Sequence, residues 1–248
     1  MLFERAVPAG PAASPESFYT GLGLAELAPP DRPYLVCNFV VSADGKATAD
    51  GRTAQLGGPG DRAAFHLLRT QVDAVLAGTG TLRVERYGAL VREPRLADIR
   101  IAEGRDAQPL AVVISRSGDI PFDIPLFADP GSRVAVYTSA GVALPTTAAQ
   151  LIRRELPAGG SELGSVLRSL RRDHGVRSLL CEGGPALFNA LLAEDLVDEL
   201  FLTLAPALLG GGELTVTSGA DLAAPLTLRL VWALEQDSHL LMRYAVAR

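Results

Sequence analysis

Two glycine-rich segments of this 248-residue sequence each follow an apolar run and lead into a stretch of helical periodicity. The first is Gly78-Thr79-Gly80-Thr81, after the run DAVLA, and the second is Glu182-Gly183-Gly184-Pro185, after the run VRSLLC. Glycine lets the backbone approach a ligand closely, and the free N–H groups in the first turn of a helix favour a phosphate. Because the carboxyl ends of parallel strands form the ligand crevice of open α/β folds, the two loops predict a phosphate or nucleotide site.

Two acidic side chains are predicted to face the same crevice. Asp44 follows the apolar run at 34–41 in the turn Ala43-Asp44-Gly45-Lys46, and Glu182 opens the second glycine loop. An Asp-Gly turn after a strand is, taken alone, more often only a turn. The shared position of Asp44 and Glu182 at strand ends makes both of them candidates for a functional role.

The motifs of other common chemistries are absent from the sequence. Gly21-Leu22-Gly23 follows no strand and has Glu26 where a dinucleotide fingerprint needs its third small residue. Lys46 is the only lysine and is followed by Ala47, which excludes a phosphate-binding loop of the Gly-Lys-Ser/Thr kind. No serine lies in a Gly-x-Ser-x-Gly elbow, the three histidines have no metal-ligand spacing, and a zinc deaminase signature is missing.

Composition favours a protein of the cytosol with a sizeable core. Hydrophobic residues make up 48% of the chain, and the formal net charge of −5 argues against a general nucleic-acid surface. No run approaches the roughly 20 apolar residues that a membrane helix needs, and the N-terminus does not resemble a targeting signal. Cys37 and Cys181 lie in apolar runs, where reduced thiols pack as small hydrophobes.

Short apolar runs alternate with helical stretches, which predicts an α/β fold with a mostly parallel sheet. The expected strands are 34–41, 73–78, 110–115, 133–138 and 176–181, and helices are expected over about 64–72, over 161–174 and from residue 185. The segment 149–156 fits either helix or strand. The runs at 199–205, 226–234 and 239–246 are strand-like, and the short link between the last two predicts an antiparallel C-terminal hairpin.

The first 31 residues are rich in Pro, Gly and Ala and show no sustained period. We therefore expect residues 1–31 to form a loosely packed N-terminal arm and residues 32–248 to form one domain.

From residue 33 onward the sequence resembles the reductase domain of the riboflavin-biosynthesis deaminase-reductase family. The stretches SADGKATADGRTAQLGGPGDRAAFHLLRTQVDAVLAGTGTL and SLLCEGGPALFNALLAEDLVDELFLTLAPALLGGG carry the likeness in order and spacing. The resemblance implies a dihydrofolate-reductase-like three-layer fold, usually a homodimer, without the family's deaminase half. It also implies that NADPH reduces the ribosylamino group of a phosphorylated pyrimidine to a ribityl chain, as in 5-amino-6-(5-phosphoribosylamino)uracil reductase.

The resemblance also assigns residues to the two ligands. Those at positions that bind the cofactor are Val41, Gly78, Thr79, Gly80, Thr81, Glu85, Ser115, Arg116, Gly183, Gly184, Pro185, Ala186, Leu187 and Phe188. Those at positions that bind the substrate are Asn38, Thr53, Arg69, Arg92 and Glu182, with the arginines on the phosphate and Glu182 on an amino group. Ser115 and Arg116 match the turn that holds the adenosine 2′-phosphate, which favours NADPH over NADH.

Hydride transfer needs little acid–base machinery because the cofactor carries the chemistry. Asp44 is the candidate catalytic residue, either as the proton source or as the stabiliser of an iminium. Arg69 also fits a plain solvent-facing helix arginine, and Glu85-Arg86-Tyr87 departs from the acidic pair and proline of many members. Two alternatives therefore stay open: a folate or pterin reductase on the same fold, and a non-catalytic NADP-binding protein.

Overall fold

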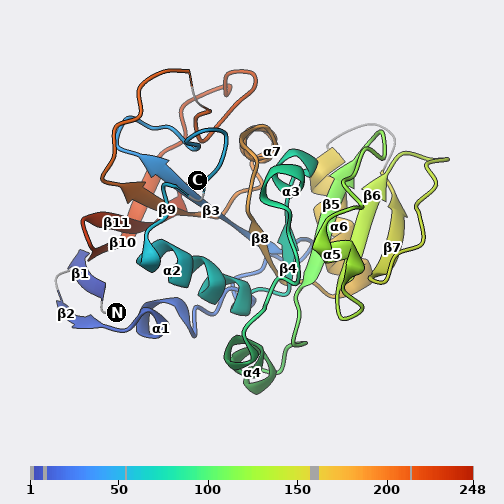
Figure 1. Ribbon diagram of the computed structural model, residues 1–248, viewed down its shortest axis with the longest axis horizontal. Helices are drawn as coiled ribbons and strands as arrows, with labels where there is room; N and C mark the ends of the chain where they lie inside the picture. Colours follow the sequence, from blue (N-terminus) through green and yellow to red (C-terminus); the bar gives the residue numbers. More distant parts are fainter. Residues whose placement is uncertain (1–2, 8–9, 54, 157–161, 213, 248) are drawn as a thin grey trace. The chain divides into compact units, whose positions relative to one another are not determined.

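The chain divides into two units, which the computed structural model describes over residues 3–7, 10–53, 55–156, 162–212 and 214–247 (Figure 1). Unit 1 comprises Met1–Leu22, Leu35–Leu68 and Pro185–Arg248, and unit 2 comprises Gly23–Tyr34 and Arg69–Gly184. Among the described residues, no helix combines the length and the apolar character needed to cross a membrane. A cytosolic location stays a prediction.

Unit 2 contains five parallel strands in the order β8-β4-β5-β6-β7. Their bounds are β4 Ala74–Leu76, β5 Leu110–Ser115, β6 Arg133–Thr138, β7 Gln150–Glu155 and β8 Ser178–Cys181. Parallel strands covered on both faces consist of nearly continuous apolar residues, and every residue of β4 and β8 is buried. The strands predicted at 73–78, 110–115, 133–138 and 176–181 are confirmed.

The helices of unit 2 are α3 Thr79–Glu85, α4 Pro94–Ala102, α5 Pro125–Ala128 and α6 Glu162–His174. Figure 1 shows α6 lying along the strands β5 and β6, and its stripe of Leu163, Val166, Leu167 and Leu170 is buried. Gly175, with φ +67°, follows its last residue. The helix predicted over 161–174 is therefore confirmed, except that residue 161 lies outside the described residues.

The segment 149–156, which periodicity left undecided, contains the strand β7. It pairs in parallel with β6 over its whole length, from Gln150 opposite Arg133 to Glu155 opposite Thr138. None of its residues is fully buried. Pairing with one neighbour, rather than an apolar pattern of its own, gives this segment its conformation.

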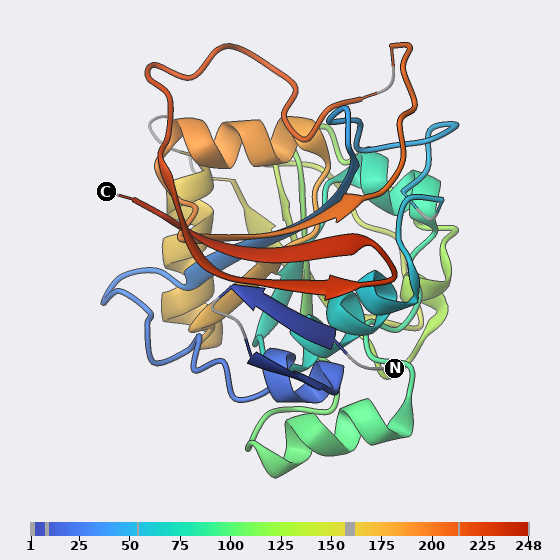
Figure 2. The same cartoon turned by 90° about the vertical axis from the view of Figure 1, so that its left-hand side faces the viewer.

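Unit 1 combines one parallel strand pair with antiparallel strands, in the order β2-β1-β10-β11-β9-β3. Strand β3 (Tyr34–Ser42) is parallel to β9 (Glu199–Ala205), and β11 (His239–Val246) is antiparallel to both β9 and β10 (Leu228–Gln236). Figure 2 shows the β10–β11 hairpin in red beside β1 (Phe3–Val7) in blue. The predicted C-terminal hairpin is confirmed, and its turn residues Asp237 and Ser238 both have positive φ.

The helices of unit 1 are α1 (Pro15–Tyr19), α2 (Pro59–Thr70), whose last residues from Arg69 belong to unit 2, and α7 (Pro185–Ala193). The helices predicted over 64–72 and from residue 185 are confirmed as α2 and α7. Together the two units form the predicted α/β fold, with mostly parallel strands and an antiparallel C-terminal edge.

The N-terminal residues are more ordered than their composition predicts. Strand β1 pairs with β10 and with β2 (Gly10–Ala13), and Tyr19 is 3% exposed against the edge of Trp232. Leu24 is fully buried within unit 2. The expected loose packing of residues 1–31 is therefore wrong at these points, because single anchoring side chains between turns create no sequence period. The domain limit at residue 31 stays a prediction.

Candidate functional site

The two glycine loops lie side by side in unit 2. They follow the neighbouring parallel strands β4 and β8, whose last residues Leu76 and Cys181 are opposite each other. The N–H of Gly78 donates a hydrogen bond to the carbonyl of Gly183 at 2.7 Å. Parallel pairing of β4 and β8 thus brings together two loops about a hundred residues apart in sequence. This confirms the prediction that both loops lie at the carboxyl ends of parallel strands.

The loops pack so closely that two of their glycines cannot gain a side chain freely. A Cβ on Gly78 would lie 3.2 Å from the backbone nitrogen of Gly184, and a Cβ on Gly184 would lie 3.2 Å from Oγ1 of Thr81. A Cβ on Gly80 would meet nothing within 4 Å. Helix α3 starts at Thr79 without a side-chain cap. Its first N–H groups, beside the open space at Gly80, therefore suit an anionic group such as a pyrophosphate.

Glu182, directly after β8, forms a two-point ion pair with Arg69 inside unit 2. Nε of Arg69 lies 2.7 Å from Oε1 of Glu182, Nη2 lies 2.8 Å from Oε2, and Nη1 donates to the carbonyl of Leu90 at 2.9 Å. The side chains are 6% and 1% exposed, so the alternative of a solvent-facing helix arginine is wrong. Burial works to lower the pKa of Arg69, but the charge and hydrogen bonds of Glu182, together with those of Tyr87, outweigh it and the pKa is raised. Arg69 therefore fixes the position and charge of the Glu182 carboxylate.

Tyr87 completes this cluster and was not among the predicted site residues. Its ring centroid lies 5.1 Å from Cζ of Arg69, and its hydroxyl is hydrogen-bonded to Glu182. Burial, followed by the charge of Glu182, raises the pKa of Tyr87 well above its usual value. Tyr87 is thus a neutral donor to the carboxylate. The only sequence signal was the departure Glu85-Arg86-Tyr87 from the expected pattern.

The Ser115–Arg116 turn lies at the end of β5. Arg116 has an ion-pair partner that the sequence did not suggest. Ser115 is 9% exposed, whereas the side chain of Arg116 is 75% exposed and is ion-paired with Glu162 in the first turn of α6. Nothing in the sequence marks Glu162, since 46 residues separate it from Arg116. Arg116 can therefore bind a 2′-phosphate only if that phosphate displaces the carboxylate of Glu162.

Asp44 lies in unit 1, directly after β3, and its carboxylate is held by donors from two segments. Oδ1 accepts hydrogen bonds from the hydroxyl of Ser42 at 2.6 Å and from the N–H of Leu209 at 3.1 Å, and Oδ2 accepts one from the N–H of Gly210 at 2.7 Å. The hydroxyl of Ser42 and these N–H groups lower the pKa of Asp44 to about 2. At neutral pH Asp44 is therefore a carboxylate, which suits a stabiliser of positive charge better than a proton source.

The remaining predicted residues differ in what they can offer a ligand. Phe188 and Val41 are 3% and 4% exposed, and the ring of Phe188 packs on Phe39 at 4.7 Å, so these two side chains belong to the core of unit 1. Arg92 is exposed, and its guanidinium makes one long contact, 3.4 Å, to the carbonyl of Ala89. The other predicted residues are at least partly exposed: Asn38, Thr53, Glu85, Ala186 and Leu187, together with Pro185 at the end of the second loop.

An α/β fold with paired glycine loops after neighbouring parallel strands defines a protein with an anion-binding site at the ends of its strands, and the sequence comparison identifies its family. The chain belongs to the RibD C-terminal domain family, which matches residues 33–240.

Relatives in this family are named as reductases. The sequence is 29% identical over 225 residues to a Methanothermobacter thermautotrophicus protein named 2,5-diamino-6-ribosylamino-4(3H)-pyrimidinone 5′-phosphate reductase, covering 87% of this chain and 99% of that protein. It is 27% identical over 186 residues to the protein of the same name from Archaeoglobus fulgidus, covering 73% and 83% of the two chains.

Solved structures share the fold. A pyrimidine reductase-like protein from Corynebacterium diphtheriae superposes with a TM-score of 0.79 and 22% identity, covering 95% of this chain and all of that one. RibD from Acinetobacter baumannii superposes with a TM-score of 0.73 and 25% identity, covering 88% of this chain and 59% of that one. These likenesses confirm the predicted fold of the family.

Proposed function

We propose that the protein is a nicotinamide-dependent reductase that converts the ribosylamino group of a phosphorylated pyrimidine to a ribityl group in riboflavin biosynthesis. The observation that carries the proposal is the buried Glu182 carboxylate, fixed by Arg69 and joined through the chain to the paired glycine loops. Arg69 already binds both oxygens of this carboxylate, so the ion pair holds the start of the second glycine loop in place for a ligand. Family membership and the names of the relatives agree with it.

The residues of the chain have separate tasks in this proposal. The glycine loops bind the pyrophosphate through backbone N–H groups, Glu182 fixes the start of the second loop, and exposed Arg92 binds the substrate phosphate. Arg69 acts through Glu182, because its own guanidinium is already engaged. The cofactor supplies the hydride when bound. Asp44 stabilises the positive charge of an iminium, since its carboxylate is ionised at neutral pH.

The proposed cofactor is NADPH, on the strength of the Ser115–Arg116 turn. A guanidinium and a hydroxyl at the end of β5 suit the 2′-phosphate dianion. Glu162 holds this guanidinium in the described structure, so binding of NADPH exchanges one anionic partner of Arg116 for another. NADH, which has no 2′-phosphate, does not require this exchange.

We also propose that the protein is a homodimer formed through unit 1. Of the ten exposed large hydrophobic side chains among the described residues, seven lie in this part of the chain: Leu208, Leu209, Leu214, Leu226, Leu228, Leu230 and Leu240. Exposed apolar side chains concentrated in one segment mark interaction surfaces. Sedimentation of the purified protein should therefore give twice the mass of one chain.

One assay tests the function directly. NADPH oxidation is followed by absorbance with the 2,5-diamino-6-ribosylaminopyrimidinone 5′-phosphate, with 5-amino-6-(5-phosphoribosylamino)uracil, and with dihydrofolate. We expect turnover with at least one of the two pyrimidines and none with dihydrofolate. Turnover with dihydrofolate alone would replace the proposal with the folate alternative. Binding of NADPH without turnover of any substrate would favour the non-catalytic alternative.

A further inference from the structure

Arg100, in the last turn of helix α4, is a buried arginine whose donors reach backbone carbonyls of unit 2. It is 1% exposed. Nη1 donates to the carbonyl of Arg69 at 2.7 Å and to that of Val72 at 2.6 Å, and Nε donates to that of Asp106 at 2.7 Å. A longer contact of 3.4 Å joins Nη1 to the carbonyl of Thr70. Among the described residues, every hydrogen-bond acceptor of Arg100 is therefore a main-chain group.

The carbonyls of Arg69 and Thr70 belong to the last turn of α2, where the carbonyls of a helix have no partner within the helix. These carbonyls carry partial negative charge, which a cation stabilises. Burial and then the charge of Arg105 lower the pKa of Arg100 to about 10, so its guanidinium is charged at neutral pH. Arg100 therefore fixes the end of α2 and the segment that leads from it into β4.

A second contact fixes the group that the side chain of Arg69 meets. Oε1 of Gln108 accepts a hydrogen bond from the N–H of Val91 at 3.0 Å, and Nε2 of Gln108 donates to the carbonyl of Val91 at 2.5 Å. Val91 follows Leu90, whose carbonyl accepts a hydrogen bond from Nη1 of Arg69. Arg100 thus holds the main chain of Arg69, and Gln108 holds the segment that receives its side chain.

The position of Arg69 affects both glycine loops. Its side chain binds Glu182 at the start of the second loop. The main chain after it continues into β4, which ends at Leu76, shortly before Gly78 of the first loop. A displacement at the end of α2 is therefore transmitted to the loops through one ion pair and one short strand.

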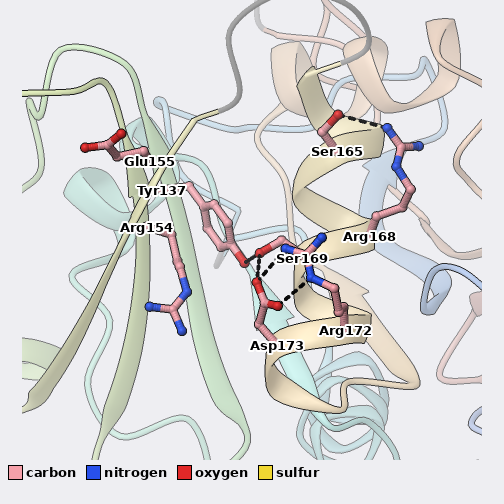
Figure 3. A pocket seen from close by; sticks show the side chains of 8 residues that line it. All are labelled: Tyr137, Arg154, Glu155, Ser165, Arg168, Ser169, Arg172 and Asp173. Atoms are coloured by element: carbon pink, nitrogen blue, oxygen red, sulfur yellow. Dashed lines mark hydrogen bonds and ion pairs between the residues drawn. The ribbon is translucent and has the colours of Figure 1, made fainter.

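Other arginines of unit 2 differ from Arg100. Arg154 and Arg168 lie beside a pocket at α6 and point away from each other (Figure 3). Arg154 donates to the carbonyl of Arg153, the preceding residue, and Arg168 donates to the hydroxyl of Ser165 in its own helix. Each bonds within its own element, whereas the guanidinium of Arg100 joins α4, the end of α2 and the segment before β4.

We propose that Arg100 and Gln108 are positioning residues of the cofactor site, which act through Arg69 and Glu182 on the second glycine loop. The inference rests on the proposed function of that loop in binding the pyrophosphate. A binding site keeps its geometry only when the contacts around its residues fix their conformations. The planar guanidinium of Arg100 can hold several carbonyls in one geometry, which the flexible ammonium of a lysine cannot do.

Two measurements on the full chain test the proposal without turnover. Fluorescence titration gives the Kd for NADP⁺, and NMR gives the hydrogen-exchange rate of the Nε–H of Arg69, which is hydrogen-bonded to Glu182. The variants are Arg100→Met and Gln108→Met. The control Tyr137→Leu alters a buried side chain of β6, which β5 and β4 separate from β8, and urea denaturation measures the stability of all three.

We expect Arg100→Met and Gln108→Met each to weaken NADP⁺ binding about tenfold and to accelerate the exchange of the Arg69 Nε–H about tenfold, because Arg69 is no longer held in place. Tyr137→Leu should lower the urea midpoint but leave both readings at their wild-type values. If Arg100→Met does not fold, Gln108→Met, at a half-buried residue, decides the matter by the same readings.

Wild-type Kd and exchange rate in the two variants, or the same changes in Tyr137→Leu at an equal loss of stability, would overturn the proposal. Arg100 and Gln108 would then serve stability alone. A wild-type protein that does not bind NADP⁺ would contradict the proposed function instead, and the exchange rate of Arg69 would still decide whether Arg100 and Gln108 hold it.

Discussion

The two units each hold a carboxylate at the end of a strand, but they do so by opposite means. Glu182 in unit 2 is 1% exposed by its side chain and is neutralised by one residue, Arg69. Asp44 in unit 1 is exposed and is held by one hydroxyl and two backbone N–H groups. A buried charge depends on its partner, because water cannot replace it, whereas an exposed one keeps its solvation. The same change at the two carboxylates should therefore have very different costs.

The largest expected effect follows removal of the buried partner. Arg69→Met should lower the free energy of unfolding by about 3–5 kcal/mol, because it leaves Glu182 charged and buried without a counter-ion. Urea denaturation followed by circular dichroism measures the loss. Arg92→Met, at an exposed arginine of the same unit, is the control and should change stability by less than about 0.5 kcal/mol.

A double variant separates charge from packing in this cluster. Arg69→Met with Glu182→Met should recover much of the stability lost in the single variant, because an apolar pair often replaces a buried ion pair at little cost. If Arg69→Met alone costs less than about 1 kcal/mol, Glu182 is solvated or neutral in the folded protein and the contrast with Asp44 disappears.

The next effect concerns the neutral donor to Glu182. Tyr87→Phe removes one hydroxyl but keeps the ring beside Arg69, and we expect a loss of about 1.5–3 kcal/mol, typical of a hydrogen bond to a charged group. Tyr244→Phe is the matched control, since among the described residues that hydroxyl donates only to the sulfur of Met242, a weak acceptor. Equal unfolding midpoints for the two variants would show that Tyr87 does not support Glu182.

Asp44→Asn should change stability little, because the site is exposed and water can replace the lost acceptor, and it should reduce kcat about tenfold with the affinity for NADPH unchanged, because it removes the proposed stabilising charge. The folded-state pKa of Asp44 is lowered, so its contribution to stability is present above the unfolded value near 3.8 and is lost as the pH falls through about 2. Full turnover of the variant would remove Asp44 from the mechanism.

The pH profile of the same variant distinguishes the two roles of Asp44. A charge stabiliser with a pKa of about 2 gives no acid limb between pH 5 and 8. A limb in this window that is present in the wild-type protein and absent from Asp44→Asn would identify Asp44 as the proton source instead.

The sequence predicted the elements whose residues carry a local pattern. Apart from β7, the strands of unit 2 are largely apolar runs, and α6 has a buried stripe at helical spacing, so these elements were identified with nearly their observed bounds. Strand β7 and the N-terminal strands have no such pattern, because their conformation comes from a neighbouring strand. Local periodicity cannot report such a neighbour.

The site was predictable for the same reason only in part. The glycine loops and Glu182 directly follow apolar runs, a pattern that can be recognised in the sequence. The partners that decide what each residue does, such as Arg69 for Glu182 across 113 residues, come from tertiary packing. Arg69 was assigned to a phosphate from resemblance, whereas its contacts favour the role of holding Glu182, and Tyr87 and Glu162 had no signal of comparable strength.

The smallest expected effect concerns Arg116, whose side chain is 75% exposed and whose pair with Glu162 is therefore of the exposed kind. An exposed ion pair contributes about 0–1 kcal/mol, so Glu162→Gln should tighten NADPH binding by no more than about fivefold while leaving NADH unchanged. Fluorescence titration of both cofactors measures the ratio. Arg116→Gln should weaken NADPH only. If both variants bind both cofactors like the wild-type protein, the 2′-phosphate is held elsewhere, and the preference for NADPH loses its support.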